Sequence, residues 1–178
     1  MNILLDMDGV LANFRDAAAR VNWLPLDAHL EEWNFHHKAG LTDEQFYANI
    51  AADIEFWDKL EPYPWLEQLA SVVSYFDPHY HIVSYTNGDG SSAKQRWIKK
   101  YLGHERAWMG KGDRSRMAMS GTVLIDDRDK NVSAFRSKCG WAITFPQPWN
   151  AAREALPCDR ALFVESMLEQ LRTIEDAP

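Results

Sequence analysis

The stretch Met1-Asn2-Ile3-Leu4-Leu5-Asp6-Met7-Asp8-Gly9 decides the fold of this chain. Its apolar run Ile3–Leu5 leads to a glycine turn signal, and a run bounded in this way is typical of a buried strand. Asp6 and Asp8 follow the run two residues apart, and unpaired carboxylates in such a place repel each other and resist burial. A pair of solvated loop acids is the structural alternative. A functional pair requires partners elsewhere in the chain.

The composition is that of an ordinary globular protein, and 178 residues suit one domain with a modest insertion. The formal net charge of −7 argues against a nucleic-acid polymer or an anionic membrane as a partner, because no basic field is evident. No apolar window approaches the length of a membrane span, and the short opening run does not have the form of a signal peptide. Cys139 and Cys158 lack metal-type spacing, so we expect free thiols in a cytoplasmic setting.

Four further apolar runs favour strands, at residues 81–85, 106–109, 122–125 and 141–145. Segments with helical periodicity separate these runs, and the first helical segment is expected over residues 10–21. The alternation of strand and helix predicts an α/β fold with a parallel sheet of five strands.

Residues 26–60 differ in character, with acids, histidines and aromatics but no clear strand signal. Thr42-Asp43-Glu44-Gln45 has the form of a capping box and predicts a helix start. We therefore predict a small helical cap over residues 25–60, inserted into a core domain over 1–24 and 61–178. Adjacent His36 and His37 invite a metal interpretation, but neighbours on a helix point in different directions, so a surface or hinge role is favoured.

Polar side chains follow three of the five predicted strands at the point where each strand ends. These side chains form the pairs Asp6/Asp8, Thr86/Asn87 and Asp126/Asp127. Ligands of open α/β sheets bind outside the carboxyl ends of the strands. The shared placement predicts a single active site at this edge of the sheet.

The chemistry of these residues points to phosphoryl transfer. Clustered carboxylates without softer ligands suit a hard cation such as Mg²⁺. The helix start after Gly90, with Lys94 in its first turn, suits a phosphate. A carboxylate can attack a phosphate as a nucleophile when a bridging metal reduces the repulsion between them.

The motifs resemble the four signature motifs of the haloacid dehalogenase (HAD) superfamily. In chain order they are Asp6-Met7-Asp8-Gly9-Val10, Thr86, Lys94 and Asp126-Asp127. Within this superfamily, residues 1–148 most resemble the 5′(3′)-deoxyribonucleotidase family of pyrimidine-type 5′-nucleotidases. The stretches that carry this closer similarity are 6–12, Leu60-Glu61-Pro62, 94–103 and Leu124-Ile125-Asp126-Asp127-Arg128. The resemblance implies a three-layer Rossmann-like core, a helical cap and an Mg²⁺-dependent phosphatase.

The superfamily also implies roles for individual residues. Asp6 would be the nucleophile that becomes a phosphoaspartate, and it would bind the metal as well. Asp8 would be the general acid and then the general base, with its carbonyl on Mg²⁺. Thr86 would hydrogen-bond the phosphate, and Lys94 would neutralise it.

The remaining roles are less uniquely placed. Asp127 would complete the metal ligands, with Asp126 in support. Asn87 is grouped with the phosphate-binding residues, although the family often has Ser after the Thr. The family's further basic residue corresponds to Lys111 or Arg114, and the sequence leaves that choice open.

The cap residues Trp33, Phe35, Phe56 and Trp57 are candidates for stacking on a nucleobase, with Trp33 and Phe35 the preferred pair; the alternative is that they form the core of the cap. The leading function is hydrolysis of nucleoside monophosphates, with deoxyribonucleotides preferred and a homodimer left open. A HAD phosphatase for another small ester, such as a sugar phosphate, is the second interpretation. A non-catalytic phosphate-binding module is the third interpretation. Such a module needs no nucleophile, so the presence of Asp6 together with Asp8, Lys94 and Asp127 argues against it.

Overall fold

A computed structural model describes residues 1–27, 30–86, 90–110, 112–155 and 159–175. Within these ranges five strands form one sheet of order β3-β2-β1-β4-β5, and every pairing is parallel. The strands are β1 (Asn2–Asp6), β2 (His81–Ser84), β3 (Ala107–Met109), β4 (Thr122–Asp126) and β5 (Trp141–Thr144). The predicted α/β fold with a parallel sheet is confirmed.

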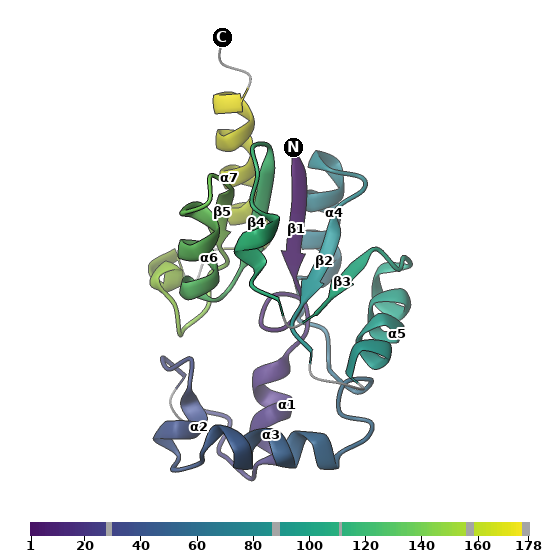
Figure 1. Ribbon diagram of the computed structural model, residues 1–178, viewed down its shortest axis with the longest axis vertical. Coiled ribbons are helices and arrows are strands. Elements are labelled where there is room, and N and C mark those ends of the chain that lie inside the picture. Colours follow the sequence, from purple (N-terminus) through teal and green to yellow (C-terminus); the bar gives the residue numbers. More distant parts are fainter. Residues whose placement is uncertain (28–29, 87–89, 111, 156–158, 176–178) are drawn as a thin grey trace.

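The opening strand lies at the centre of the sheet, between β2 and β4 (Figure 1). Leu5 is in register with Ile82 on one side and with Ile125 on the other. This pairing aligns the carboxyl ends of the three central strands. Asp6, Ser84 and Asp126, the last residues of these strands, therefore lie at the same edge.

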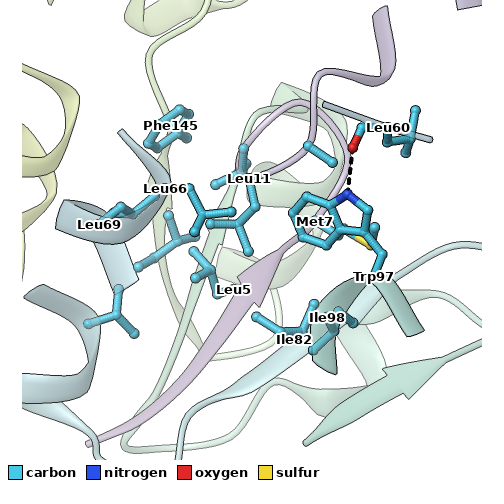
Figure 2. Close-up of a cluster of buried hydrophobic side chains, with 14 of the residues drawn as sticks. Leu5, Met7, Leu11, Leu60, Leu66, Leu69, Ile82, Trp97, Ile98 and Phe145 are labelled. Atoms are coloured by element: carbon cyan, nitrogen blue, oxygen red, sulfur yellow. Dashed lines mark hydrogen bonds between the residues drawn. The ribbon is translucent and has the colours of Figure 1, made fainter. Parts of the chain in front are cut away.

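Helices cover both faces of the sheet because the side chains of β1 alternate between two cores. Ile3 and Leu5 belong to a large core with residues from α4 (Leu66–Phe76), α5 (Gly90–Leu102) and α7 (Arg160–Glu175). Figure 2 shows part of this core around Leu5. Leu4 points to the other face, where it packs with α6 (Asp129–Arg136). The result is the three-layer arrangement that the resemblance implies.

The chain crosses from the core to the cap and back through two adjacent segments. Gly9, at φ +82°, turns the first segment after β1. The backbone N–H of Asn13 donates to the Glu61 carbonyl at 2.9 Å, and that of Tyr63 donates to the Leu11 carbonyl at 2.8 Å. The indole of Trp97 fixes the returning segment by donating to the Leu60 carbonyl at 2.7 Å (Figure 2). The two crossings thus form a paired connection.

Three helices lie together beyond the carboxyl edge of the sheet, α1 (Phe14–Val21), α2 (Phe35–Lys38) and α3 (Asp43–Ala52), and the last two fall within the predicted cap (Figure 1). The capping box at Thr42 is formed, with the Gln45 N–H donating to Oγ1 of Thr42 at 3.2 Å. The ring of Phe14, at the start of α1, packs against the Phe46 and Phe56 rings. By these contacts α1 packs with the cap, while the predicted division at residues 24 and 60 stays a prediction.

Some local expectations differ from the structure. Residues 10–12 are not helical, because the N–H groups of Leu11 and Ala12 both donate to the Met7 carbonyl in a tight loop. Two 3-10 helices, η1 (Arg114–Met117) and η2 (Ala151–Ala155), lack a clear sequence signal. Cys139 is a free, exposed thiol, and Cys158 lies outside the described residues. Among the described helices, none has the length and apolar character needed to cross a bilayer.

Candidate active site

Three buried carboxylates meet at the carboxyl edge of the sheet. Asp6 ends β1, Asp126 ends β4, and Asp127 follows directly. Oxygen atoms of the three side chains lie within 4.8 Å of one another. Asp6 is 3% exposed, and the other two are fully buried. The predicted convergence of β1 and β4 acids is thus present in the structure.

Arg114 of η1 is the internal counter-charge of this cluster. One guanidinium nitrogen donates to Asp6 Oδ1 at 2.8 Å, and the other donates to Asp126 Oδ2. Burial alone would lower the pKa of Arg114, but the charges of Asp6 and Asp126 raise it above its ordinary value. Arg114 therefore stays charged while it is buried. Of the two basic residues left open by the sequence, Arg114 lies in the site and Lys111 lies outside the described residues.

One guanidinium does not balance the buried acids. Burial raises the pKa of Asp6 to about 7, even though Arg114 acts in the opposite direction. Burial also raises the pKa of Asp127 well above its ordinary value, and the charge of Asp6 adds to this effect. The cluster is therefore short of positive charge.

The donor set fits a hard cation. Asp127 Oδ1 is buried and has no hydrogen-bond partner among the residues that the structure describes. A buried acceptor without a donor is costly, and a bound cation would satisfy it. The three acids offer only carboxylate oxygens, which are the ligands that Mg²⁺ prefers.

The loop after β5 orients Asp127. Trp149 Nε1 donates to Asp127 Oδ2 at 3.0 Å, and Asn150 Nδ2 donates to the Asp127 carbonyl at 2.8 Å. Gln147 Nε2 donates to the Gly9 carbonyl at 2.5 Å, so the same loop also fixes the turn after β1. Sequence reasoning missed these residues. The available signal was a polar segment directly after a fifth strand that ends at the same edge.

Asp8 is bound to Lys94 of α5. The fully buried Lys94 ammonium donates to Asp8 Oδ2, to Ser84 Oγ at 2.8 Å and to the Tyr85 carbonyl at 2.9 Å. Ser84 Oγ in turn lies 3.0 Å from Asp8 Oδ2. Three acceptors thus fix the Lys94 ammonium, and its contact with Asp8 Oδ2 orients the Asp8 carboxylate. Asp8 Oδ1 has no partner within the described ranges.

Thr86 also offers an unused group. It is 5% exposed, and its hydroxyl has no partner in the part of the chain that the structure describes. Gly90 lies so close that a Cβ built on it would be 3.0 Å from Thr86 Oγ1 and 2.9 Å from Trp57 Nε1. Asn87, which was grouped with Thr86, lies outside the described residues.

A cavity of about 470 Å³ separates the acids from the cap. Asp6, Asp8, Asp127 and Arg114 line its core side. Aromatic side chains line much of the rest: Phe14, Trp33, Phe35, Phe46, Tyr47, Trp57, Tyr85 and Trp149. The structure thus brings Trp33 and Phe35 to the cavity with the catalytic candidates.

Phe56 does not line this cavity. It is 3% exposed, and its ring packs edge-on against Phe14 at 5.8 Å and Trp57 at 4.8 Å. A small helical unit needs such aromatics for its own core, and this requirement accounts for the position of Phe56. Trp57, from the same turn, lines the cavity and places its ring 4.1 Å from the Lys94 ammonium.

Arg15 is a cavity residue without a sequence signal. It is buried, donates to the Glu32 carbonyl at 2.9 Å, and lies 4.2 Å from the centre of the Phe35 ring. Its guanidinium is also 5.2 Å from the centre of the Trp149 ring. A single arginine on an amphipathic helix reads as solvent-exposed, so only the cap fold reveals this cation.

No family model and no curated protein matches the chain. Solved structures, by contrast, share its fold. A HAD family hydrolase from Deinococcus radiodurans R1, with bound phosphate and sodium, gives a TM-score of 0.56 at 15% identity over 94% of this chain and 95% of that one. A candidate phosphoglycolate phosphatase from Lactobacillus delbrueckii subsp. bulgaricus gives 0.65 at 11% identity over 94% and 97%.

A third structure, a HAD-superfamily hydrolase of subfamily IA from Geobacter sulfurreducens PCA, gives a TM-score of 0.59 at 9% identity over 94% of this chain and 95% of that one. The chain therefore has the fold of HAD-superfamily hydrolases. The closer similarity to 5′(3′)-deoxyribonucleotidases stays a prediction, because these identities establish the fold alone.

Proposed function

We propose that the protein is a Mg²⁺-dependent phosphatase that hydrolyses nucleoside monophosphates through an aspartyl-phosphate intermediate. The observation that carries this proposal is the set of unpartnered buried oxygens at one edge of the sheet. Among the described residues, Asp8 Oδ1, Asp127 Oδ1 and Thr86 Oγ1 all lack a hydrogen-bond partner. A cation together with a phosphate group would satisfy all three.

The acids divide the chemistry between them. Asp6, at the end of the central strand, is the nucleophile: one carboxylate oxygen forms a bond to phosphorus as the ester P–O bond breaks. Asp8 gives a proton to the departing alcohol oxygen. In the second half-reaction Asp8 takes a proton from water, the water oxygen attacks phosphorus, and the bond from Asp6 to phosphorus breaks to release phosphate.

The other residues bind and orient. Asp6, Asp127 and the Asp8 carbonyl would hold Mg²⁺, and Asp126 would support them through Arg114. Mg²⁺, when bound, offsets the repulsion between carboxylate and phosphate and orients the two groups. The Thr86 hydroxyl donates to a phosphate oxygen, and Arg114 holds Asp6 in position through its 2.8 Å contact.

The cavity supports a large, flat leaving group. A volume of about 470 Å³ falls in the range of pockets for drug-sized ligands, and it exceeds what a two- or three-carbon ester would fill. The aromatic lining favours a nucleobase, which binds by stacking. Trp33 lines the cavity and is 38% exposed, with the Trp149 ring at 6.4 Å and the Arg128 guanidinium 5.0 Å from the centre of its ring.

One observation favours a second candidate function, the hydrolysis of a small acidic phosphomonoester. The buried guanidinium of Arg15 lines the cavity and would pair with a carboxylate on the substrate. Among solved structures with this fold, one is named as a candidate phosphoglycolate phosphatase. Substrates of the two kinds differ in size and in charge, so a direct comparison separates them.

The test is phosphate release from 5′- and 3′-nucleoside monophosphates, sugar phosphates and carboxylated phosphoesters, with Mg²⁺ or with a chelator. We expect Mg²⁺-dependent release with the highest kcat/KM for nucleotides, and no release in the Asp6→Asn variant. Activity that favours sugar or carboxylated phosphoesters would contradict the nucleotide proposal. Undiminished activity in Asp6→Asn would contradict the covalent mechanism.

A further inference from the structure

A second cluster of metal-type ligands lies in the cap, away from the carboxylates of the core. It consists of His36 and His37 of α2 and Asp43, the first residue of α3. Nε2 of His36 lies 2.7 Å from Asp43 Oδ1, and Nε2 of His37 lies 2.8 Å from the same oxygen. The expectation that adjacent histidines point apart is therefore wrong here. The two rings are 4.3 Å apart and converge on one atom.

The length of α2 explains this convergence. The helix has only four residues, Phe35–Lys38, so it does not impose the regular angular spacing of a longer helix. The His36 ring stacks on the Phe46 ring of α3 at 4.2 Å, which fixes it beside the start of that helix. His36 is 4% exposed, whereas the side chains of His37 and Asp43 are 47% and 69% exposed. One rigid ligand and two adjustable ligands thus face a common point.

We propose that His36, His37 and Asp43 form a second cation site, specific for a late first-row divalent ion such as Zn²⁺, Co²⁺ or Ni²⁺. Two imidazoles and one carboxylate form a ligand set that these ions favour. The geometry that supports this site does not depend on the proposed phosphatase activity.

The distances in the cluster are somewhat shorter than those that coordination requires. Ligand atoms that share one tetrahedral Zn²⁺ at bond lengths of about 2.0–2.2 Å lie roughly 3.3–3.6 Å from one another. The observed separations of 2.7 and 2.8 Å therefore require an outward movement of roughly 0.5–0.9 Å. The exposed side chains of His37 and Asp43 have room to make this movement.

The protonation states also suit a cation. The hydrogen bond from His36 lowers the pKa of Asp43, so the carboxylate is ionised at neutral pH. Coordination of Zn²⁺ through Nε2 places the ring N–H of each histidine at Nδ1, and in His36 this atom is buried without a hydrogen-bond partner among the described residues. Three protein ligands leave at least one coordination position open.

That open position would face the substrate cavity. His36 and Asp43 both line the cavity that also contains Asp6 and Asp8. An ion in the cap would therefore offer a coordination position to a nitrogen or oxygen atom of a molecule bound there. It would also join α2 to α3. The carboxylates of the core and the histidines of the cap would sort cations by type, because hard ions prefer the all-oxygen cluster.

The test is calorimetric titration of the metal-stripped protein with Zn²⁺ in saturating Mg²⁺, which occupies the carboxylate cluster. We expect one Zn²⁺ per chain, and affinity reduced by on the order of 100-fold in His37→Gln, since even the outer partners of metal ligands are worth 10–100-fold. His79→Gln is the matched control, because His79 is exposed and lies outside the cluster. Co²⁺ should show absorption bands of a nitrogen-ligated ion that disappear in His37→Gln.

A second variant separates the two sites. Asp127→Asn should retain Zn²⁺ binding, because Asp127 belongs to the core cluster. The absence of binding in saturating Mg²⁺, equal affinity in His37→Gln, or loss of binding in Asp127→Asn would each overturn the proposal. In each of these cases the three side chains form a hydrogen-bonded link between α2 and α3 and no cation site.

Discussion

At the scale of single residues, the site depends on close approach and on charge. The turn at Gly9 packs directly against the Asp127 carboxylate, and the Asp6 carboxylate lies close to those of Asp126 and Asp127. Residue 9 must be glycine because a Cβ there would collide with Asp127, and the carboxylate of Asp6 ties the site to pH and to cations. Predictions for these two residues therefore do not depend on the identity of the substrate.

Gly9→Ala should disrupt the position of Asp127. A Cβ at residue 9 would lie 2.1 Å from Asp127 Oδ2, and the φ of +82° adds backbone strain. Gly40→Ala is the control, since Gly40 has φ +83° with nothing within 4 Å of its Cβ. Both variants share a strain of about 1 kcal/mol, but Gly9→Ala should lose about 1–3 kcal/mol more in denaturant unfolding and should bind Mg²⁺ more weakly. Equal losses in the two variants would contradict the role of Asp127.

The buried acids should link stability to pH and to metal. The pKa of Asp6 is about 7 in the folded protein against 3.8 ordinarily, so the folded state holds this proton more tightly. Its contribution to the free energy of unfolding is then complete below pH 3.8 and is lost as pH rises towards 7. A bound cation favours the ionised form and offsets this loss. The increase in Tm on addition of Mg²⁺ should therefore grow between about pH 5 and pH 7.5, and K⁺ is the control. A pH-independent increase would argue against the charge imbalance.

At the scale of elements, the loop after β5 connects a metal-ligand candidate to the cap. Trp149 donates to Asp127, packs near the Trp33 ring, and lies near the Arg15 guanidinium. One side chain thus touches the carboxylate cluster and the wall of the cavity.

Trp149→Phe tests this role because it keeps an aromatic ring and removes the donor to Asp127. We expect the Kd for Mg²⁺ to rise by about 10–100-fold, the usual effect of removing a partner that orients a metal ligand. Trp23→Phe is the control, since Trp23 is 92% exposed. Calorimetric titration with Mg²⁺ measures the difference, and an unchanged Kd in Trp149→Phe would show that Asp127 needs no such orientation.

The elements also show what a sequence can predict. The apolar runs of β1 and β4 end in acids, and parallel pairing brings Asp6 and Asp126 together as a direct consequence. Trp149 and Arg15 could not be placed in this way, because their positions depend on loop and cap geometry without a regular period. The paired histidines were misjudged for the same reason, since a four-residue helix does not obey the spacing rule of a long one.

At the scale of the whole molecule, the proposed function assigns the chemistry to the edge of the sheet and the choice of substrate to the cap. Asp6 and Asp126 end strands of the sheet, whereas Phe35 begins α2. Helix α2 lies beyond the carboxyl edge of the sheet (Figure 1). A substrate in the cavity would contact residues of both regions, because both line it. Changes in the cap should therefore alter which substrate is chosen while the rate of the chemical steps stays similar.

Trp33→Ala should reduce discrimination between nucleotides and sugar phosphates. Loss of one stacking partner costs about 1–3 kcal/mol, which corresponds to a roughly 5- to 150-fold lower kcat/KM for nucleotides. Sugar phosphates should be little affected. Trp23→Ala is the matched control, because Trp23 is an exposed tryptophan that does not line the cavity. If the ratio of kcat/KM values is the same in both variants, Trp33 does not stack on the base.

The pairing of the two connecting segments at Ala12 and Pro62 has a consequence for the evolution of such a protein. Since the outgoing and returning segments are hydrogen-bonded to each other, the ends of the intervening segment are neighbours in space. A segment whose two ends are adjacent can lengthen, shorten or be exchanged without changing the order or register of the strands in the sheet. Under the proposed function, the substrate contacts of this segment can change during evolution while the carboxylates at the edge of the sheet stay in place.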